Sequence, residues 1–382
     1  MRTYVEINLN NLAHNAKVIT SKYNDYKYFF AVLKSESYGH GERIVNSLTK
    51  NGINYIAVSY ISEALKVREY NKDIPILLLQ PIEINELEIA KKNNLTITIH
   101  DYDYLKEVLK KNEKIKVHLK LDTGMNRLGF KSKEKVKKAV EEINKSDYIL
   151  EGIYSHFATI GLFDNNYDIQ VQNFKNLTSL IDLKEIPIVH FASSVILLSH
   201  PKLDFCNGVR TGILLYGYNV CPQTSNIGLK NKLRNIRNKY YQKKYNISKT
   251  YTNVKIDVKP AMKMYTGILQ IKDLKQGDKI GYGAYTAKKD MKIAILPIGY
   301  NNGIGKNNSY RYVIINDKKY EVIGSIGMNM MSIKIDKHVK INDKVLVMGD
   351  SITLGAMSRF KNASISETLL EIGKNNPKIY IE

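Results

Sequence analysis

The pattern of hydrophobic and polar positions changes once along the chain, at about residue 222. Before that point, short runs of apolar, branched and aromatic residues alternate with longer stretches of helical periodicity. The runs predict eight β-strands, at residues 28–34, 55–59, 74–79, 95–99, 115–121, 149–154, 186–191 and 205–210. Helices are expected between them, at residues 41–50, 62–69, 132–144 and 168–183, the third with Ser132 as its N-cap. Eight rounds of strand and helix favour an α/β fold, a (β/α)8 TIM-like barrel of parallel strands.

Two further observations complete the predicted architecture. No glycine-rich dinucleotide fingerprint follows the first predicted strand, which disfavours a doubly wound nucleotide-binding domain. After residue 222, short strands are separated by Gly, Asn and Asp turn signals, at residues 265–271, 291–297, 312–315, 320–323, 331–335 and 344–348. We therefore expect a barrel over residues 1–222, with residues 1–10 packing on the second domain. A basic insertion or linker follows at 223–260, and then a smaller, mainly β, C-terminal domain at 261–382.

The net charge is +21, and one stretch is more basic than the rest of the chain. No acidic residue occurs between Asp204 and Asp257, and that interval includes the basic residues Lys230, Lys232, Arg234, Arg237, Lys239, Lys243 and Lys244. Such a run either is a solvated surface insertion or binds a polyanion. Because no zinc-finger or RNA-binding motif accompanies it, we favour the solvated insertion and do not expect a nucleic-acid partner.

The cysteine content and the hydropathy indicate a cytoplasmic protein. The two cysteines, Cys206 and Cys221, form neither a metal-ligand spacing nor a disulfide framework, so we expect no metal site and a reducing compartment. The first residues lack the apolar core of a signal peptide, and no apolar run is long enough to span a bilayer. We therefore expect no membrane association.

Reactive side chains recur where the predicted barrel strands end. They are Lys34, Lys120, His156, Ser194 and Arg210. The carboxyl ends of barrel strands surround one mouth, where catalytic residues of such barrels lie. An amine at the end of an apolar strand is partly desolvated, which lowers its pKa and makes it a nucleophile toward an aldehyde. Ser194 and the turn at 210–213 fall in the loops that favour phosphate. The parts suit an aldehyde cofactor that also carries a phosphate.

At these positions the chain resembles the alanine racemase family, a family of pyridoxal-phosphate enzymes. The matching segments occur in family order, and they are FFAVLKSESYGHG (29–41), KLDTGMNRLGF (120–130), YSHFA (154–158), VRTGILLYG (209–217), IGYG (280–283) and LPIGY (296–300). The resemblance implies pyridoxal 5'-phosphate held on Lys34, a small amino-acid substrate, and a homodimer whose subunits share their active sites.

The resemblance also implies a role for each site residue. Lys34 and the partner subunit's Tyr282 would be the two catalytic bases. Tyr38, Ser194, Gly212 and Ile213 would hold the phosphate, Arg210 would face the pyridine nitrogen, and His156 would lie against the ring. Arg127 would contact the cofactor and the substrate carboxylate, with help from the Met328 backbone. The supporting residues would be Lys120 as a carbamate that orients Arg127, His190 as a bridge from Arg210 to Tyr282, and Tyr300.

These roles agree with the chemistry of a racemase. Racemisation needs removal of the Cα proton on one face and its return on the other, which two opposed bases accomplish. Arg210 does not give up its proton, so it leaves the pyridine nitrogen unprotonated and disfavours transamination. It also argues against decarboxylases, which rely on an acid at that nitrogen.

Several positions depart from the family pattern. Ser193 and Asn302 stand where Asn and Asp are usual, Asn329 replaces Asp, and Lys374 lies where some relatives have an aromatic residue. We expect these changes to affect the substrate more than the reaction. Alanine is the expected substrate, and the alternatives are serine, another small amino acid, or a cofactor-binding relative without catalysis.

Overall fold

The computed structural model describes residues 3–159, 164–219, 229–244, 254–282, 285–306 and 311–382. Cys221 and Gly283 lie outside the described residues. The chain forms two compact units. The barrel unit comprises residues 13–34 and 45–258, and the sheet unit comprises residues 1–12, 35–44 and 259–382. The chain passes between the units within α1 (Leu9–Lys22) and at α2 (Lys34–Tyr38).

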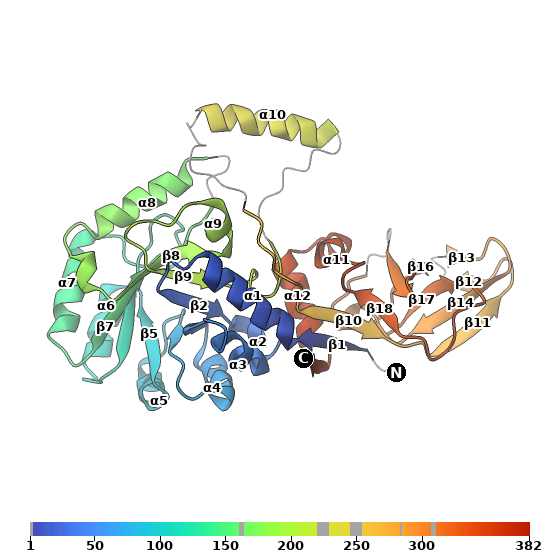
Figure 1. Cartoon of the computed structure of the whole chain (residues 1–382), viewed down its shortest axis with the longest axis horizontal. Helices are drawn as coiled ribbons and strands as arrows, with labels where there is room; N and C mark the ends of the chain where they lie inside the picture. Colours follow the sequence, from blue (N-terminus) through green and yellow to red (C-terminus); the bar gives the residue numbers. More distant parts are fainter. Residues whose placement is uncertain (1–2, 160–163, 220–228, 245–253, 283–284, 307–310) are drawn as a thin grey trace. The chain divides into compact units, whose positions relative to one another are not determined.

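The barrel unit contains eight parallel strands that form a closed barrel (Figure 1). The strands are β2 (Tyr28–Val32), β3 (Tyr55–Val58), β4 (Ile76–Leu78), β5 (Leu95–Ile99), β6 (Lys116–Lys120), β7 (Ile149–Tyr154), β8 (Ile188–Ser193) and β9 (Gly208–Thr211). Phe30 of β2 pairs with Arg210 of β9, and this pairing closes the barrel. The predicted TIM-like barrel is confirmed, and each observed strand overlaps its predicted run.

Helices follow most of the strands. They are α3 (Val45–Thr49), α4 (Ile61–Tyr70), α5 (Leu87–Lys92), α6 (Tyr102–Leu109), α7 (Lys133–Asn144), α8 (Asn166–Leu177), α9 (Ser194–Ser199) and α10 (Leu229–Lys244), with 3-10 turns at Glu42–Ile44, Ile84–Glu86 and Leu183–Glu185. Ser132 caps α7, as predicted, because its Oγ accepts a hydrogen bond from the Lys135 amide at 3.2 Å.

Aromatic and imidazole rings fill much of the barrel interior. The His190 ring stacks between those of Phe30 and Tyr154, with centroid separations of 4.5 and 4.7 Å. The Phe30 ring also stacks on that of Tyr55 at 4.3 Å. These rings come from four different strands, β2, β3, β7 and β8. Side chains from these four strands therefore form one packed core, in which polar ring atoms need internal partners.

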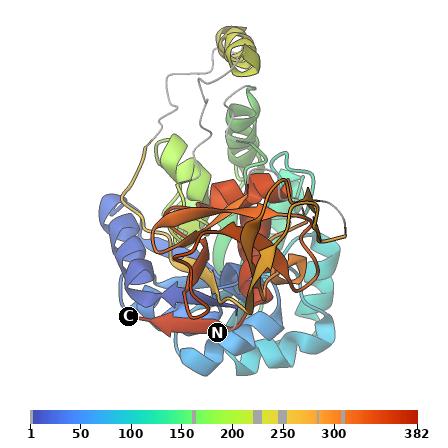
Figure 2. The ribbon, with the colours of Figure 1, turned by 90° about the vertical axis from the view of Figure 1, so that its right-hand side faces the viewer.

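The sheet unit contains a nine-stranded sheet in the order β11-β14-β17-β16-β15-β18-β10-β1-β19. Its strands are β1 (Tyr4–Asn8), β10 (Met262–Thr266), β11 (Gln270–Leu274), β14 (Met291–Leu296), β15 (Tyr312–Ile315), β16 (Lys318–Ile323), β17 (Met331–Ile335), β18 (Val345–Met348) and β19 (Lys378–Ile381), beside a small hairpin of β12 (Lys279–Ile280) and β13 (Tyr285–Thr286). Because β1 and β19 pair in parallel, the two termini of the chain lie in this unit (Figure 2).

Three details of the second half differ from the prediction. The expected strand 265–271 is two strands, β10 and β11, interrupted at Gly267, which lacks a side chain to pack. The unit also contains α11 (Leu354–Lys361) and α12 (Ile365–Lys374), which were not predicted, although Ser364 and Glu367 form a capping box for α12. Within the expected basic linker, residues 229–244 form the helix α10.

Candidate active site

Five of the predicted site residues belong to the barrel unit and lie at the carboxyl ends of its strands. Lys34 comes two residues after β2, Lys120 is the last residue of β6, and His156 comes two residues after β7. Ser194 follows β8 as the first residue of α9, and Arg210 is the third residue of β9. Since all five strands are parallel neighbours in one closed barrel, these residues share its carboxyl-terminal mouth.

Lys34 is partly buried, and its pKa lies below that of an ordinary lysine. Burial lowers the pKa most, the positive charge of Arg127 lowers it further, and Glu63 opposes both. A lowered pKa increases the fraction of neutral amine near pH 7, and the neutral amine is the nucleophilic and basic form.

The chain leaves Lys34 through a left-handed turn. Four successive residues other than glycine, Ser35 to Tyr38, have φ between 52° and 55°. The Gly39 amide closes the turn with a hydrogen bond of 3.2 Å to the Ser35 carbonyl. Each such residue costs on the order of 1 kcal/mol in left-handed geometry, so strain is concentrated directly after the predicted cofactor lysine.

Lys120 is buried, and burial together with the charges of Arg210 and Arg127 lowers its pKa to about 7. Its Nζ donates to the Leu121 carbonyl at 3.1 Å and lies 4.9 Å from the centre of the Tyr154 ring. An ordinary buried lysine would be expected to pair with a carboxylate. Across the described ranges of the chain, Lys120 takes part in no ion pair.

Arg210 is buried and still cationic at neutral pH, because burial lowers its pKa only to about 10. Its Nη1 donates to His190 Nδ1 at 2.7 Å, and its Nη2 donates to the Ser155 carbonyl at 2.7 Å and to His156 Nδ1 at 3.2 Å. Within the part of the chain that the structure describes, no carboxylate forms an ion pair with this guanidinium.

The position of His190 supports one half of the expected bridge from Arg210 to the partner subunit's Tyr282, and the contact with Tyr282 stays a prediction. His190 contacts Arg210 through Nδ1, as expected, but its Nε2 lies 2.9 Å from His118 Nδ1. Both ring nitrogens of His190 thus have partners inside the barrel of this single chain. His156 also contacts Arg210, and burial together with the charge of Arg210 lowers its pKa to about 3, so both imidazoles are neutral at pH 7.

Ser194 and Gly212 form a small polar cradle after the last two strands. The Gly212 amide donates to Ser194 Oγ at 2.9 Å, and Gly212 and Ile213 are buried. A serine hydroxyl and adjacent backbone amides suit the oxygens of a phosphate.

Arg127 lies on the loop that follows β6, and the loop is held by Asp122. The Asp122 carboxylate accepts hydrogen bonds from the amides of Gly124 and Asn126, at 3.1 and 2.9 Å. Burial opposes ionisation of Asp122, but these amides and the charge of Lys131 outweigh it and keep its pKa below the ordinary value. The Arg127 side chain itself is exposed.

Four predicted site residues belong to the sheet unit, namely Tyr38, Tyr282, Tyr300 and Met328. Burial raises the pKa of Tyr38. Tyr282 lies between β12 and β13 with a φ of 54°, and its side chain is 93% exposed. The backbones of Tyr300 and Met328 are linked, because the Tyr300 and Asn301 amides donate to the Gly327 and Met328 carbonyls, both at 3.0 Å.

Comparison with known proteins decides the family. The alanine racemase N-terminal domain matches residues 7–220, and the alanine racemase C-terminal domain matches residues 261–380. The chain belongs to the alanine racemase family. It is 34% identical to an alanine racemase of Borreliella burgdorferi over 387 residues, which cover 98% of this chain and 96% of that protein.

Solved structures agree with this assignment. The crystal structure of alanine racemase from E. faecalis has a TM-score of 0.86 and 25% identity, covering 100% of this chain and 98% of that chain. A histidine racemase from Leuconostoc mesenteroides has a TM-score of 0.84 at 24% identity, covering 100% of this chain and 98% of that chain, and so shares the fold. Among the described residues of this family member, no helix is both long and apolar enough to cross a membrane.

The structure gives one of the departures from the family pattern a structural role. Asn302 Nδ2 donates to Asn376 Oδ1 at 2.8 Å, and Asn376 Nδ2 donates back to the Asn302 carbonyl at 3.0 Å. An aspartate at position 302 could not donate this bond. Asn329 and Lys374 are exposed, and nothing in the structure explains these two substitutions.

Sequence reasoning missed a group of polar residues inside this alanine racemase barrel. Glu151 accepts hydrogen bonds from Tyr55, Thr96 and Lys116, and His118 Nε2 lies 3.2 Å from its carboxylate. The available signal was a charged or imidazole side chain within strands that otherwise read as apolar, at positions 118 and 151. Such side chains need partners inside a barrel.

Proposed function

We propose that this chain is a pyridoxal-phosphate-dependent alanine racemase that interconverts L- and D-alanine by proton transfer at Cα. The observation that carries the proposal is the pair of basic groups at the barrel mouth. Lys34 has a lowered pKa, and Arg210 is a buried cation without a carboxylate partner among the described residues. Membership of the alanine racemase family supports alanine as the substrate.

The donor set at the mouth fits the cofactor. Lys34 would hold it through Nζ, and Ser194 with the backbone of Gly212 and Ile213, assisted by Tyr38, would hold its phosphate. Ser194 Oγ and the Gly212 amide already lie 2.9 Å apart in a buried turn, which supports this assignment. When bound, pyridoxal phosphate withdraws electrons from the substrate Cα and so makes its proton more acidic.

Arg210 supports proton transfer over competing chemistry. A guanidinium with a pKa of about 10 keeps its proton at pH 7 and has only donors to offer. Facing a pyridine nitrogen, it would leave that nitrogen unprotonated and so limit electron withdrawal. Limited withdrawal favours return of the proton to Cα and disfavours transamination.

Lys34 and Tyr282 are the two bases in this proposal. The lowered pKa of Lys34 gives its Nζ a neutral fraction able to take the Cα proton on one face of the substrate. Tyr282 is 93% exposed on its own chain, which leaves its side chain accessible to a partner subunit. We therefore propose a homodimer in which the partner subunit's Tyr282 serves the other face.

Arg127 and the backbone of Met328 are proposed to bind the substrate carboxylate, and Lys120 to orient Arg127. Because burial and the charges of Arg210 and Arg127 lower the pKa of Lys120 to about 7, part of its amine is neutral at neutral pH, and a neutral amine reacts with carbon dioxide to form a carbamate. A carbamate would turn this lysine into an anion that attracts Arg127.

The scarcity of cysteine also supports a cytosolic location.

A screen of amino acids tests the proposed substrate. The purified chain with pyridoxal phosphate is incubated separately with the L-forms of alanine, serine and histidine, and D-product is measured by chiral chromatography. D-alanine should form fastest. If D-serine or D-histidine forms faster than D-alanine, then serine or histidine is the substrate instead of alanine. If no amino acid gives a D-product, the chain is a binding protein without catalytic activity.

A further inference from the structure

Four side chains form a continuous hydrogen-bonded chain through the barrel, from Arg210 to Glu151. Arg210 Nη1 meets His190 Nδ1 at 2.7 Å, and His190 Nε2 meets His118 Nδ1 at 2.9 Å. His118 Nε2 then meets Glu151 Oε2 at 3.2 Å. The four residues lie on β9, β8, β6 and β7, and both imidazoles are fully buried.

The chemistry of Arg210 and Glu151 at the two ends fixes the direction of donation along this hydrogen-bonded chain. A guanidinium has only donors, so His190 Nδ1 must accept, and a neutral His190 then carries its proton on Nε2. His190 Nε2–H therefore donates to His118 Nδ1, which leaves the His118 proton on Nε2, facing Glu151. A carboxylate has only acceptors, so every donor in the chain has an acceptor and both tautomers are fixed.

Glu151 remains an anion at the far end. Burial opposes its ionisation, but the hydrogen bonds from His118, Lys116 and Tyr55 outweigh burial and lower its pKa to about 2. The chain thus joins a buried cation to a carboxylate through two neutral imidazoles. Inside a barrel of low dielectric constant, such charge-assisted hydrogen bonds are strong and polarise one another.

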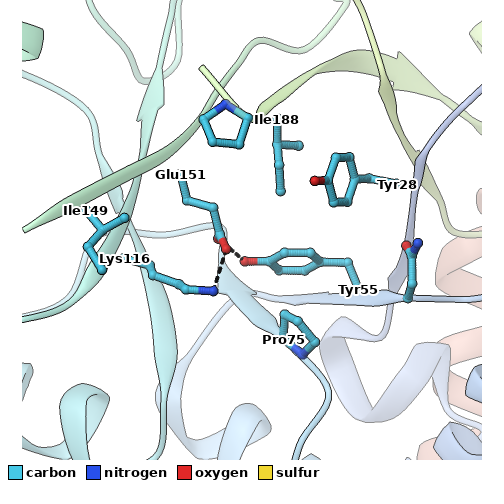
Figure 3. Close-up of a pocket in the computed structure, with 9 residues that line it drawn as sticks. Tyr28, Tyr55, Pro75, Lys116, Ile149, Glu151 and Ile188 are labelled. Carbon is cyan, nitrogen blue, oxygen red and sulfur yellow. Dashed lines mark hydrogen bonds and ion pairs between the residues drawn. The ribbon is translucent and has the colours of Figure 1, made fainter. Parts of the chain in front are cut away.

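The far side of Glu151 faces a separate pocket of about 450 Å³ (Figure 3). Lys116 Nζ donates to Glu151 Oε1 at 2.7 Å, while Tyr55 donates to Oε2. The pocket is bordered by Tyr28, Lys116, Ile149 and Ile188, which begin their strands, so it lies at the end of the barrel opposite the predicted cofactor site. Lys116 is thus a second partner of Glu151 that is not part of the chain to Arg210.

We propose that Glu151 is a positioning residue for racemisation, acting through His118 and His190 to fix the orientation and offset the charge of Arg210. This inference rests on the proposed function only for its effect on catalysis, because the hydrogen-bonded chain is a property of the polypeptide alone. Glu151 touches neither cofactor nor substrate. Its carboxylate gives Arg210 the distant counter-charge that no directly paired acid supplies among the described residues.

The hydrogen-bonded chain from Arg210 to Glu151 is tested directly in cofactor-free protein by nuclear magnetic resonance with ¹⁵N-labelled histidine. In the wild type, His118 and His190 should both carry their protons on Nε2, with low-field proton signals. Glu151→Gln removes the charge and keeps an acceptor, so both signals should move upfield. Lys116→Met is the matched control, because it removes the other partner of the same carboxylate and should leave both signals at low field.

Kinetics test the consequence for Arg210. Glu151→Gln should lower kcat by about tenfold, which is the order of loss expected when an outer hydrogen-bond partner of a functional group is removed. The KM for alanine should stay within about twofold of the wild type, since ground-state binding is untouched. Lys116→Met should keep the wild-type kcat.

Two results would overturn the inference. One is a His190 signal that stays unchanged in Glu151→Gln, and the other is an unchanged kcat despite a moved His190 signal. If Glu151→Gln does not fold, Glu151→Asp keeps the charge at a shorter reach, and smaller changes in the same directions are expected. If the wild type racemises no amino acid, the proposed function fails, and the resonance experiment still decides the hydrogen-bonded chain.

Discussion

Arg210 donates from Nη1 to Nδ1 of His190 at 2.7 Å, in a barrel interior where His190 is fully buried and Arg210 is only 5% exposed. The contact fixes the guanidinium by its edge, while Nη2 binds the Ser155 carbonyl and His156. It gives a rigid cation at the place where the proposed cofactor would present its ring nitrogen.

Replacing Arg210 by glutamate should change which reaction occurs. An acid at this position can protonate a pyridine nitrogen, which makes electron withdrawal by the cofactor stronger. A smaller share of the abstracted protons then returns to Cα. We expect racemisation to fall by about 10²- to 10³-fold. Pyruvate should form from alanine, up to one equivalent for each cofactor that takes up the amino group, and coupled reduction by lactate dehydrogenase measures it.

Arg68→Lys is the control for losing a buried guanidinium. Arg68 is also buried, and it donates to the carbonyls of Ile74, Asn93 and Asn94 on the helix side of the barrel. It should cost stability without producing keto acid. An Arg210→Glu variant with no keto acid and wild-type racemisation would contradict the role given to Arg210.

Lys120 should bind carbon dioxide in a pH-dependent way. Its pKa of about 7 means that the amine is protonated at pH 6 and mostly neutral at pH 8. The carbamate should therefore increase as the pH rises through 7. With ¹³C-bicarbonate, a carbamate carbon signal should be present at pH 8, weak at pH 6, and absent from Lys120→Ala at both.

Lys131→Ala tests whether the signal is specific, because Lys131 is largely exposed and pairs with Asp122. That variant should keep the carbamate signal. A signal that survives Lys120→Ala would assign the carbamate to another amine.

Mixing two inactive variants should restore activity if active sites are shared between subunits. Lys34→Ala lacks one base and Tyr282→Phe lacks the other. In a mixed dimer one site carries both lesions and the other carries neither, so random reassociation gives about a quarter of wild-type activity. Racemisation is measured after mixed unfolding and refolding, with each variant refolded alone as the control.

Failure of this mixture to exceed the separate variants would show that Tyr282 acts within its own chain or not at all. Sedimentation of the refolded samples confirms that dimers have formed, so that the two explanations of a negative result are separated.

Removal of residues 230–244 should leave catalysis unchanged. α10 exposes Leu233, Ile236 and Tyr240, each by more than 60%, so no core depends on them. A short glycine-serine connection in place of this segment should keep kcat within about twofold. A large loss of kcat would give the basic helix a catalytic role, whereas loss of salt-sensitive DNA retention alone would support polyanion binding.

The sequence predicted the barrel well because its strands have strong, simple patterns. β5 and β7 occupy the predicted runs without a shift, and the side chains at their ends follow from parallel topology. Lys34, Lys120 and Arg210 could therefore be placed at one mouth from the sequence. α12 was missed, although the capping box at Ser364 and Glu367 was available in the sequence.

Other features depend on tertiary contacts and could not be predicted. The left-handed turn at Ser35–Tyr38 uses residues that ordinarily avoid positive φ, so their conformational preferences do not predict it. The second partner of His190 is His118, which lies 72 positions earlier in the chain. Spacing in the sequence contains no information about which ring nitrogen faces which neighbour.

The most direct test of the proposed racemisation is the exchange of the alanine Cα proton in deuterium oxide, followed by proton nuclear magnetic resonance and chiral chromatography. With pyridoxal phosphate, the wild type should place deuterium at Cα and form D-alanine from L-alanine, and Lys34→Ala should do neither. Full exchange and racemisation by Lys34→Ala, or no exchange by the wild type, would contradict a racemase that depends on Lys34.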